Sequence, residues 1–171
     1  IYNSVILLSE NFTKEVNVLV RFVVENVFSF GDRKEFNSLP NKRLKTLNHH
    51  KYSFDGFDIL KMSSIYGANG AGKSNLIKSL FLFQKLVLNK EVPFRSSDTQ
   101  FKFNPANEDR TQVFVIEFIE GSTAFYYGIE LLNHLVMKEE LYLSGLGKKE
   151  DKLIYERVTD KNEATTITFP V

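Results

Sequence analysis

The segment that most constrains this chain is a glycine-rich octapeptide, GANGAGKS, which runs from Gly67 to Ser74. It satisfies the pattern G-x-x-x-x-G-K-[ST] at every fixed position. Glycines let the backbone fold tightly, so that successive N–H groups point inward and form a nest for an anion. Lys73 would add a positive charge to this nest, and the Ser74 hydroxyl would add a ligand for Mg²⁺. The octapeptide therefore predicts a loop that binds the phosphates of a nucleotide.

The residues around the octapeptide supply the strand and the helix that such a loop requires. The predicted strand is Ile59 to Tyr66, which lies within an apolar stretch that starts at Phe57. From Lys73 to Asn89 apolar residues recur at helical spacing on a broad face, which predicts a mostly buried helix. The helix dipole would place positive charge at the phosphates. A glycine-rich turn that only joins a strand to a helix is the structural alternative.

Strand patterns lie on both sides of this unit. Leu19 to Val27 predicts a strand, and Lys34 to Phe36 predicts a second short strand after a turn. Residues 37 to 56 have weak periodicity and favour a loop or an irregular crossover. Beyond residue 110, turn-rich separators divide the chain into short strand patterns, which predicts an antiparallel meander. Those patterns are Gln112 to Ile119, Ala124 to Leu132, Val136 to Leu143, Lys152 to Val158 and Thr165 to Phe169.

Composition narrows the class of protein. The 171 residues suit one domain or part of a larger one, and the absence of cysteine excludes disulfide frameworks, thiolate metal sites and cysteine nucleophiles. The cytosol is therefore the expected compartment. With 22 Lys and Arg against 21 Asp and Glu, the net charge of +1 draws the whole molecule neither to nucleic acid nor to an anionic membrane. No apolar run is long enough to cross a bilayer, so we expect no membrane partner.

Two blocks of sequence resemble a known family. The block SIYGANGAGKSN, from Ser64 to Asn75, and the upstream block VVENVFSF, from Val23 to Phe30, resemble the N-terminal part of ABC-type ATPases of the RecF, SMC and OLD kind. They resemble more closely the bacterial proteins labelled AAA-family ATPases, many of which are associated with phage defence. The resemblance covers about Leu19 to Arg157, and it leaves residues 1–18 as an extension. It implies that residues 19–171 are an α/β P-loop NTPase half-domain, with an N-terminal β hairpin, a strand–P-loop–helix unit and an antiparallel β subdomain.

The resemblance also implies ligands. ATP would be held by the P-loop, and Mg²⁺ would be held by Ser74. Gln100 would fill the Mg²⁺-contacting glutamine role of ABC ATPases, with an ordinary surface glutamine as the alternative. Phe28 and Phe30 would lie under the adenine or would pack in the core. The cofactor-binding residues predicted in this way are Gly67, Ala68, Asn69, Gly70, Ala71, Gly72, Lys73, Ser74 and Asn75.

Features that family members need for hydrolysis do not occur in this sequence. The Walker B strand of such enzymes has four apolar residues that end in Asp-Glu. Val113 to Glu117 comes nearest to it, and Glu117 is predicted to be a strand carboxylate that faces solvent. Ser144 to Gly147 spells part of a signature loop, but it lies between two strand patterns and so predicts a hairpin turn. We therefore expect Mg-ATP binding, with hydrolysis dependent on a C-terminal ATPase half or a second ATPase subunit, and we identify no catalytic residue on this chain.

Other functions stay open as hypotheses. One is a nucleotide-binding module that does not turn over ATP and acts by association. A P-loop kinase or GTPase would need an acceptor-binding lid or a guanine-binding N-K-x-D motif, and neither pattern occurs. DNA contact through a basic stretch is a further hypothesis, although a solvated loop with exposed His49 and His50 is the simpler interpretation. The basic residues of this stretch are Arg33, Lys34, Lys42, Arg43, Lys45 and Lys51.

Overall fold

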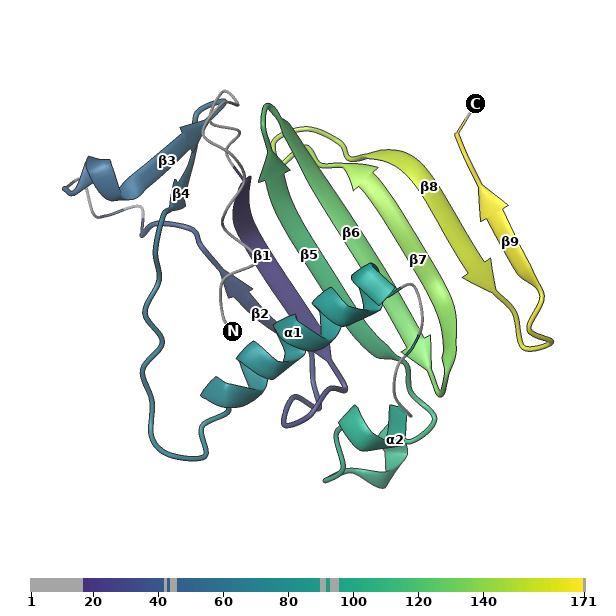
Figure 1. Cartoon of the computed structure of the whole chain (residues 1–171). Helices are drawn as coiled ribbons and strands as arrows, with labels where there is room; N and C mark the ends of the chain where they lie inside the picture. The colour runs from purple at the N-terminus through teal and green to yellow at the C-terminus, as the bar shows by residue number, and fades with distance from the viewer. Residues whose placement is uncertain (1–16, 42, 44–45, 90–91, 93–95, 171) are drawn as a thin grey trace.

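A seven-stranded antiparallel sheet with one long helix across it forms most of the fold (Figure 1). The computed structural model describes residues 17–41, 43, 46–89, 92 and 96–170. The strand order in the sheet is β2-β1-β5-β6-β7-β8-β9. The strands are β1 (Asn17–Glu25), β2 (Lys34–Asn37), β5 (Gln112–Glu120), β6 (Thr123–Leu132), β7 (Leu135–Leu143), β8 (Lys152–Thr159) and β9 (Thr165–Thr168).

The strands predicted for the N-terminal hairpin and for the meander are confirmed, and they belong to one sheet. β1 pairs with β5 from Asn17 opposite Glu120 to Glu25 opposite Val113. The hairpin is therefore continuous with the meander and is not a separate part of the fold. Because β1 starts at Asn17, the sheet begins two residues before the domain boundary predicted at residue 19. Residues 1–16 of the predicted extension lie outside the described residues.

Helix α1 (Lys73–Asn89) has the bounds that the sequence predicts, and it packs one face on the sheet. Leu82, Phe83 and Leu86 are buried against Phe22 of β1 and Phe114 of β5. The ring centroids of Phe83 lie 6.0 Å from Phe22 and 6.2 Å from Phe114, a separation typical of aromatic pairs in cores. This aromatic contact holds α1 to the central strands.

The prediction that α1 is mostly buried is wrong. Only Ser79, Leu82, Phe83 and Leu86 are buried in the helix. Ile77, Phe81 and Leu88 are 58%, 55% and 69% exposed. The sequence pattern shows how much of a helix is apolar, but the number of layers packed on it decides how much is buried. Within the described chain the sheet packs on one face of α1 only.

The loop predicted for residues 37–56 is partly wrong, because this stretch enters a second hairpin. β3 (Lys51–Phe54) pairs with β4 (Phe57–Leu60). Asp55 and Gly56 connect the two strands with φ of 46° and 70°, as the two-residue turn between hairpin strands requires. Ile59 of β4 is fully buried in a second apolar cluster with Val20, Ile119, Ala124 and Leu146.

The strand predicted before the octapeptide, Ile59 to Tyr66, is also wrong beyond Leu60. β4 ends there, and residues 61–72 run as an extended connection to α1 (Figure 1). All residues from Lys61 to Ala71 are exposed, and Tyr66 is 89% exposed. A strand needs a neighbour for its backbone N–H and C=O groups. No strand of the described chain pairs with this connection, so its apolar pattern does not become a strand here.

Short helical turns fill the segment between α1 and β5. They are α2 (Ser96–Thr99) and a 3-10 turn at Pro105–Asn107, where the Asn104 side chain accepts a hydrogen bond from the Ala106 N–H. The Phe28 N–H donates to the Thr99 carbonyl at 2.6 Å, which ties this segment to the β1–β2 turn. Within the part of the chain that the structure describes, no helix is long and apolar enough to cross a membrane.

Candidate functional site

The octapeptide Gly67 to Ser74 leads directly into α1 and lies at the surface of the molecule. Gly70 and Gly72 have φ of 82° and 90°, a region that residues with a Cβ rarely adopt. The Leu76 N–H donates to the Gly72 carbonyl at 3.0 Å, so helical bonding starts at the end of the loop. Glycine is thus required where the loop turns into the helix N-terminus. This arrangement suits the binding of an anion by backbone N–H groups.

Lys73 bridges the loop that precedes it. Its ammonium group donates to the carbonyls of Gly67 and Ala68, both at 2.7 Å. These bonds hold the charge above the loop and not out in solvent. A phosphate at the loop would offer oxygen acceptors in place of these carbonyls, because an ammonium group has three donors and prefers anionic partners.

Ser74 and Asn75 belong to the first turn of α1. Ser74 is exposed, whereas Asn75 is half-buried, and its carbonyl accepts a hydrogen bond from the Ser79 hydroxyl at 2.7 Å. Among the described residues, no group of three or more His, Cys, Asp or Glu side chains is placed to hold a metal ion. A single hydroxyl suits Mg²⁺, which keeps several waters and binds substrate phosphates together with few protein ligands.

The β1–β2 turn lies against the octapeptide, although more than thirty residues separate them in the sequence. A methyl group on Gly72 would lie 3.3 Å from the Ser29 hydroxyl oxygen and 3.5 Å from the Phe30 ring. Phe28 and Phe30 are half-buried and pack against the core, as one of the two interpretations expected. Sequence analysis did not single out Ser29. It lies in the upstream block VVENVFSF, but no sequence pattern indicates its approach to Gly72.

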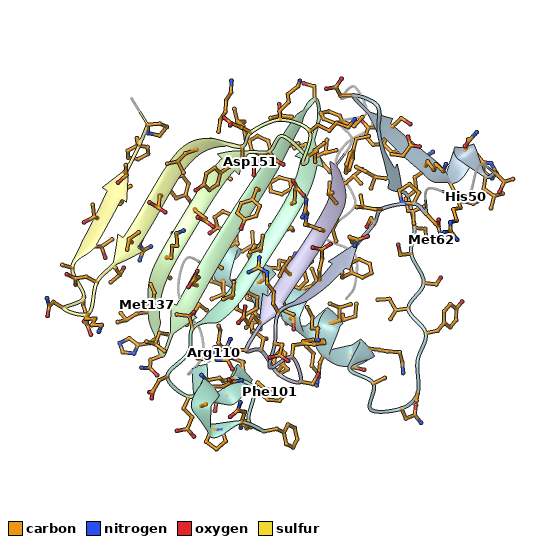
Figure 2. The ribbon with its side chains drawn as sticks, turned by 180° about the vertical axis from the view of Figure 1, so that it is seen from behind. His50, Met62, Phe101, Arg110, Met137 and Asp151 are labelled. Atoms are coloured by element: carbon orange, nitrogen blue, oxygen red, sulfur yellow. The ribbon has the colours of Figure 1, made fainter. Side chains whose placement is uncertain are left out.

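Gln100 holds the loop that precedes β5. Its amide nitrogen donates to the carbonyls of Asn107 at 2.5 Å, Glu108 at 3.1 Å and Arg110 at 3.3 Å. Its backbone forms an isolated bridge with Val27 in the β1–β2 turn. Phe101 and Arg110, which belong to this segment and the loop before β5, lie in the same lobe below the sheet (Figure 2). Gln100 is half-buried, and its contact with Mg²⁺ stays a prediction.

The prediction that Glu117 faces solvent is wrong. Its side chain is 3% exposed, and it accepts hydrogen bonds from Arg21 Nε at 2.5 Å and from the Ser144 hydroxyl. β5 lies between β1 and β6, so a side chain at its middle has neighbours on both sides. Ile116 and Phe118 face α1, and because side chains alternate along a strand Glu117 lies on the other face of the sheet. Its carboxylate is therefore satisfied on the face away from the helix that the octapeptide opens.

The prediction that residues 144 to 147 form a turn is confirmed, since they lie in the connection between β7 and β8. The Ser144 N–H donates to the Ala124 carbonyl at 2.8 Å, and the Gly145 N–H donates to the Asp151 carboxylate at 2.7 Å. Leu146 is 8% exposed and packs with Ile59 in the second apolar cluster. The connection thus covers the sheet, and it opens no helix as a signature loop would.

The basic stretch is largely exposed where it is described. Lys42 and Lys45 lie outside the described residues, whereas Arg33, Lys34 and Arg43 are exposed. Lys51 is half-buried and forms an ion pair with Asp58 at 3.8 Å. His49 and His50 are exposed, as predicted, in a 3-10 turn beside β3, with their ring centroids 4.1 Å apart. DNA contact by these residues stays a proposal.

A groove of about 900 Å³ lies between the C-terminal half of α1 and strands β5 to β8, and no octapeptide residue lines it. Glu139 lines the groove and accepts hydrogen bonds from the Tyr127 hydroxyl at 2.8 Å and the Tyr155 hydroxyl at 2.7 Å. Arg157 lies 3.4 Å from the same carboxylate. Burial, and next the bond to Glu139, raise the pKa of both tyrosines. Both tyrosines therefore stay neutral donors to Glu139, and the groove is distinct from the octapeptide site.

Comparison with known proteins assigns a family. The model described as "AAA domain, putative AbiEii toxin, Type IV TA system" matches residues 62–169, from the approach to the octapeptide to the end of β9. The chain belongs to this family. Its membership supports an AAA- or ABC-type ATPase-like domain, and the mostly-sheet α/β structure fits a P-loop NTPase-like fold. The octapeptide lies within the residues that this AAA-domain model matches. No curated protein and no solved structure matches the chain.

Proposed function

We propose that this AAA domain binds Mg-ATP through residues Gly67 to Asn75. The observation that carries the proposal is the loop itself, with Gly70 and Gly72 at positive φ where it opens the 17-residue helix α1. Lys73 exchanges its two loop carbonyls for the β and γ phosphate oxygens. The Ser74 hydroxyl binds Mg²⁺, which also contacts those phosphates and water.

ATP is the proposed nucleotide because no guanine-binding N-K-x-D motif occurs in the sequence. The resemblance of Ser64 to Asn75 to ABC-type ATPases of the RecF, SMC and OLD kind supports the same choice. We propose that Phe30 contacts the nucleotide, because its ring borders Gly72 while it also packs against the core. Gln100 would contact Mg²⁺ through its side-chain oxygen Oε1, while its Nε2 donates to the carbonyls of Asn107, Glu108 and Arg110.

The second part of the proposal is a partner, a C-terminal ATPase half or a second ATPase subunit, that completes the ATPase site. Met62, Ile65 and Tyr66 are 74%, 42% and 89% exposed on the connection to the P-loop, and Met62 stands near its start (Figure 2). Neighbouring residues of an extended chain point to opposite sides, so Ile65 and Tyr66 together need apolar cover on both sides. Apolar contacts on both sides are typical of a strand inside a sheet that is covered on both faces.

Helix α1 also has an exposed apolar side. Ile77, Phe81 and Leu88 are exposed, and their spacing places them on one side of the helix. A C-terminal ATPase half or a second ATPase subunit would add strands beside residues 62–66 and a layer over this side of α1. The same partner would supply the acidic residue that orients the attacking water, which we find nowhere in this sequence.

The chain alone is therefore expected to show no steady ATP turnover. Phosphate release under saturating Mg-ATP should not exceed the rate of the Lys73→Ala variant. The physical reason is that Glu117, the carboxylate nearest to a Walker B pattern, is bonded to Arg21 and Ser144 on the other face of the sheet. Robust turnover that Glu117→Gln abolishes, with Glu120→Gln as the matched control on the same strand, would contradict the proposal.

A nucleotide-binding module without turnover is the alternative function. It predicts that ATP binding changes association while hydrolysis stays absent even when the completing half is present. The family description names AbiEii toxins of type IV toxin–antitoxin systems. We propose that the domain serves a system of this kind, in phage defence and in the cytoplasm, with ATP binding as its control step. Restored turnover on adding the completing half would favour a hydrolase over the module.

A further inference from the structure

We propose that Ser29, on the β1–β2 turn, contacts the phosphates of the bound nucleotide and extends the P-loop site beyond its sequence motif. This inference rests on the proposed nucleotide binding. The turn brings its hydroxyl oxygen to within 3.3 Å of where a methyl group on Gly72 would lie. Gly72 directly precedes Lys73, so the hydroxyl lies beside the backbone N–H groups that open α1.

The Ser29 hydroxyl is available to a ligand. The residue is exposed, and no hydrogen bond within the described part of the chain engages its side chain. A serine hydroxyl has one donor and two acceptor lone pairs, and hydrogen bonds to anionic oxygens are stronger than neutral ones. Beside a loop of N–H groups and the Lys73 ammonium, its donor complements a phosphate oxygen.

The turn that carries Ser29 is held rigidly. Val27 and Phe30 exchange backbone hydrogen bonds at 3.0 and 2.8 Å, and Val27 is fully buried. Asn26, also fully buried, donates its amide to the carbonyls of Asn107 and Arg110, each at 3.0 Å. The backbone carbonyl of Asn26 accepts from Gln112 Nε2 at 3.3 Å. A contact group fixed in this way loses little conformational freedom on binding, which favours affinity.

The sequence offers a direct test because it contains no cysteine. Ser29→Cys places a single thiol at the turn, and Ser122→Cys places one on the exposed β5–β6 turn as the matched control. The two positions lie at opposite ends of β5, since Glu25 pairs with Val113 and Asn17 with Glu120, a separation of roughly 25 Å along the strand. We expect Mg-ATP to slow alkylation of the position-29 thiol by iodoacetamide at least fivefold and to leave the position-122 thiol unchanged.

Inorganic tripolyphosphate with Mg²⁺ distinguishes phosphate contact from nucleoside contact. Protection of the position-29 thiol by tripolyphosphate as well as by ATP supports the proposal. Protection by ATP alone would overturn it, because the turn would then border the nucleoside. Adding Lys73→Ala to Ser29→Cys should remove the protection.

Affinity gives an independent measurement. Loss of one charge-assisted hydrogen bond in Ser29→Ala should weaken Mg-ATP binding about tenfold, whereas Ser122→Ala should bind like the parent chain. Parent-like affinity of Ser29→Ala, while Lys73→Ala fails to bind, would overturn the Ser29 assignment and leave the proposed function standing. Absence of Mg-ATP binding by the parent chain would overturn both.

Discussion

Replacing Lys73 with alanine is expected to abolish Mg-ATP binding, with affinity lowered at least about a hundredfold. The lysine supplies the one side-chain cation in the P-loop motif, and its ammonium group already lies over the loop, 2.7 Å from the carbonyls of Gly67 and Ala68. Without it, the β and γ phosphate charges would meet only backbone N–H groups and the Ser74 hydroxyl. Titration of a fluorescent ATP analogue measures the difference.

Lys78 provides the control for charge. It is an exposed lysine on the same helix, one turn beyond the P-loop, and the Lys78→Ala variant removes the same formal charge. Its affinity for Mg-ATP should stay within about twofold of the parent, because Lys78 lies outside the motif and its exposed charge acts through solvent, where salt weakens it. Equal affinities of Lys73→Ala and the parent would refute the P-loop assignment. Equal losses in both variants would show that only net charge matters.

Phe83→Ala is expected to lower the free energy of unfolding by about 3–5 kcal/mol. Its ring is 6% exposed and contacts Phe22, Phe114 and Tyr127 across the interface between α1 and the sheet. Truncation leaves a cavity where the helix meets the central strands, which are too rigid to close it. Urea unfolding followed by circular dichroism measures the loss.

Phe81 makes the matched control for Phe83. It lies on the same helix but is 55% exposed, with the Lys85 ammonium 4.7 Å from its ring centroid. Phe81→Ala should cost less than about 1 kcal/mol, since it removes little buried area and one exposed cation–π contact. A cost for Phe81→Ala equal to that for Phe83→Ala would mean that α1 packs on the sheet by a different face.

Local patterns in the sequence predicted most of the elements. The bounds of α1 follow from the P-loop motif and from apolar spacing, because both depend on neighbouring residues. The meander follows from period-2 patterns and turn residues, and each of its strands pairs with the next along the chain. β3 was predicted to be part of a loop, although Asp55-Gly56 between Phe54 and Phe57 is a hairpin signal in the local sequence.

The remaining differences depend on contacts between distant parts of the chain. Residues 61–66 have a strand pattern, but the pattern cannot say whether a neighbouring strand is present. Glu117 was expected in solvent because an acidic residue usually is, whereas Arg21 and Ser144 enclose it from elements far away in sequence. The approach of Ser29 to Gly72 joins the two blocks on which the family resemblance rests. Only the folded chain brings these residues together.

The central claim is that Mg-ATP binds at the P-loop, and backbone amide NMR tests it most directly. In ¹⁵N-labelled protein titrated with Mg-ATP, the largest chemical-shift changes should fall on residues 68–74, because their N–H groups form the phosphate nest. The changes should saturate with ATP and be absent in the Lys73→Ala variant. Saturable changes confined to the groove between α1 and β5–β8, with residues 68–74 unmoved, would contradict the account.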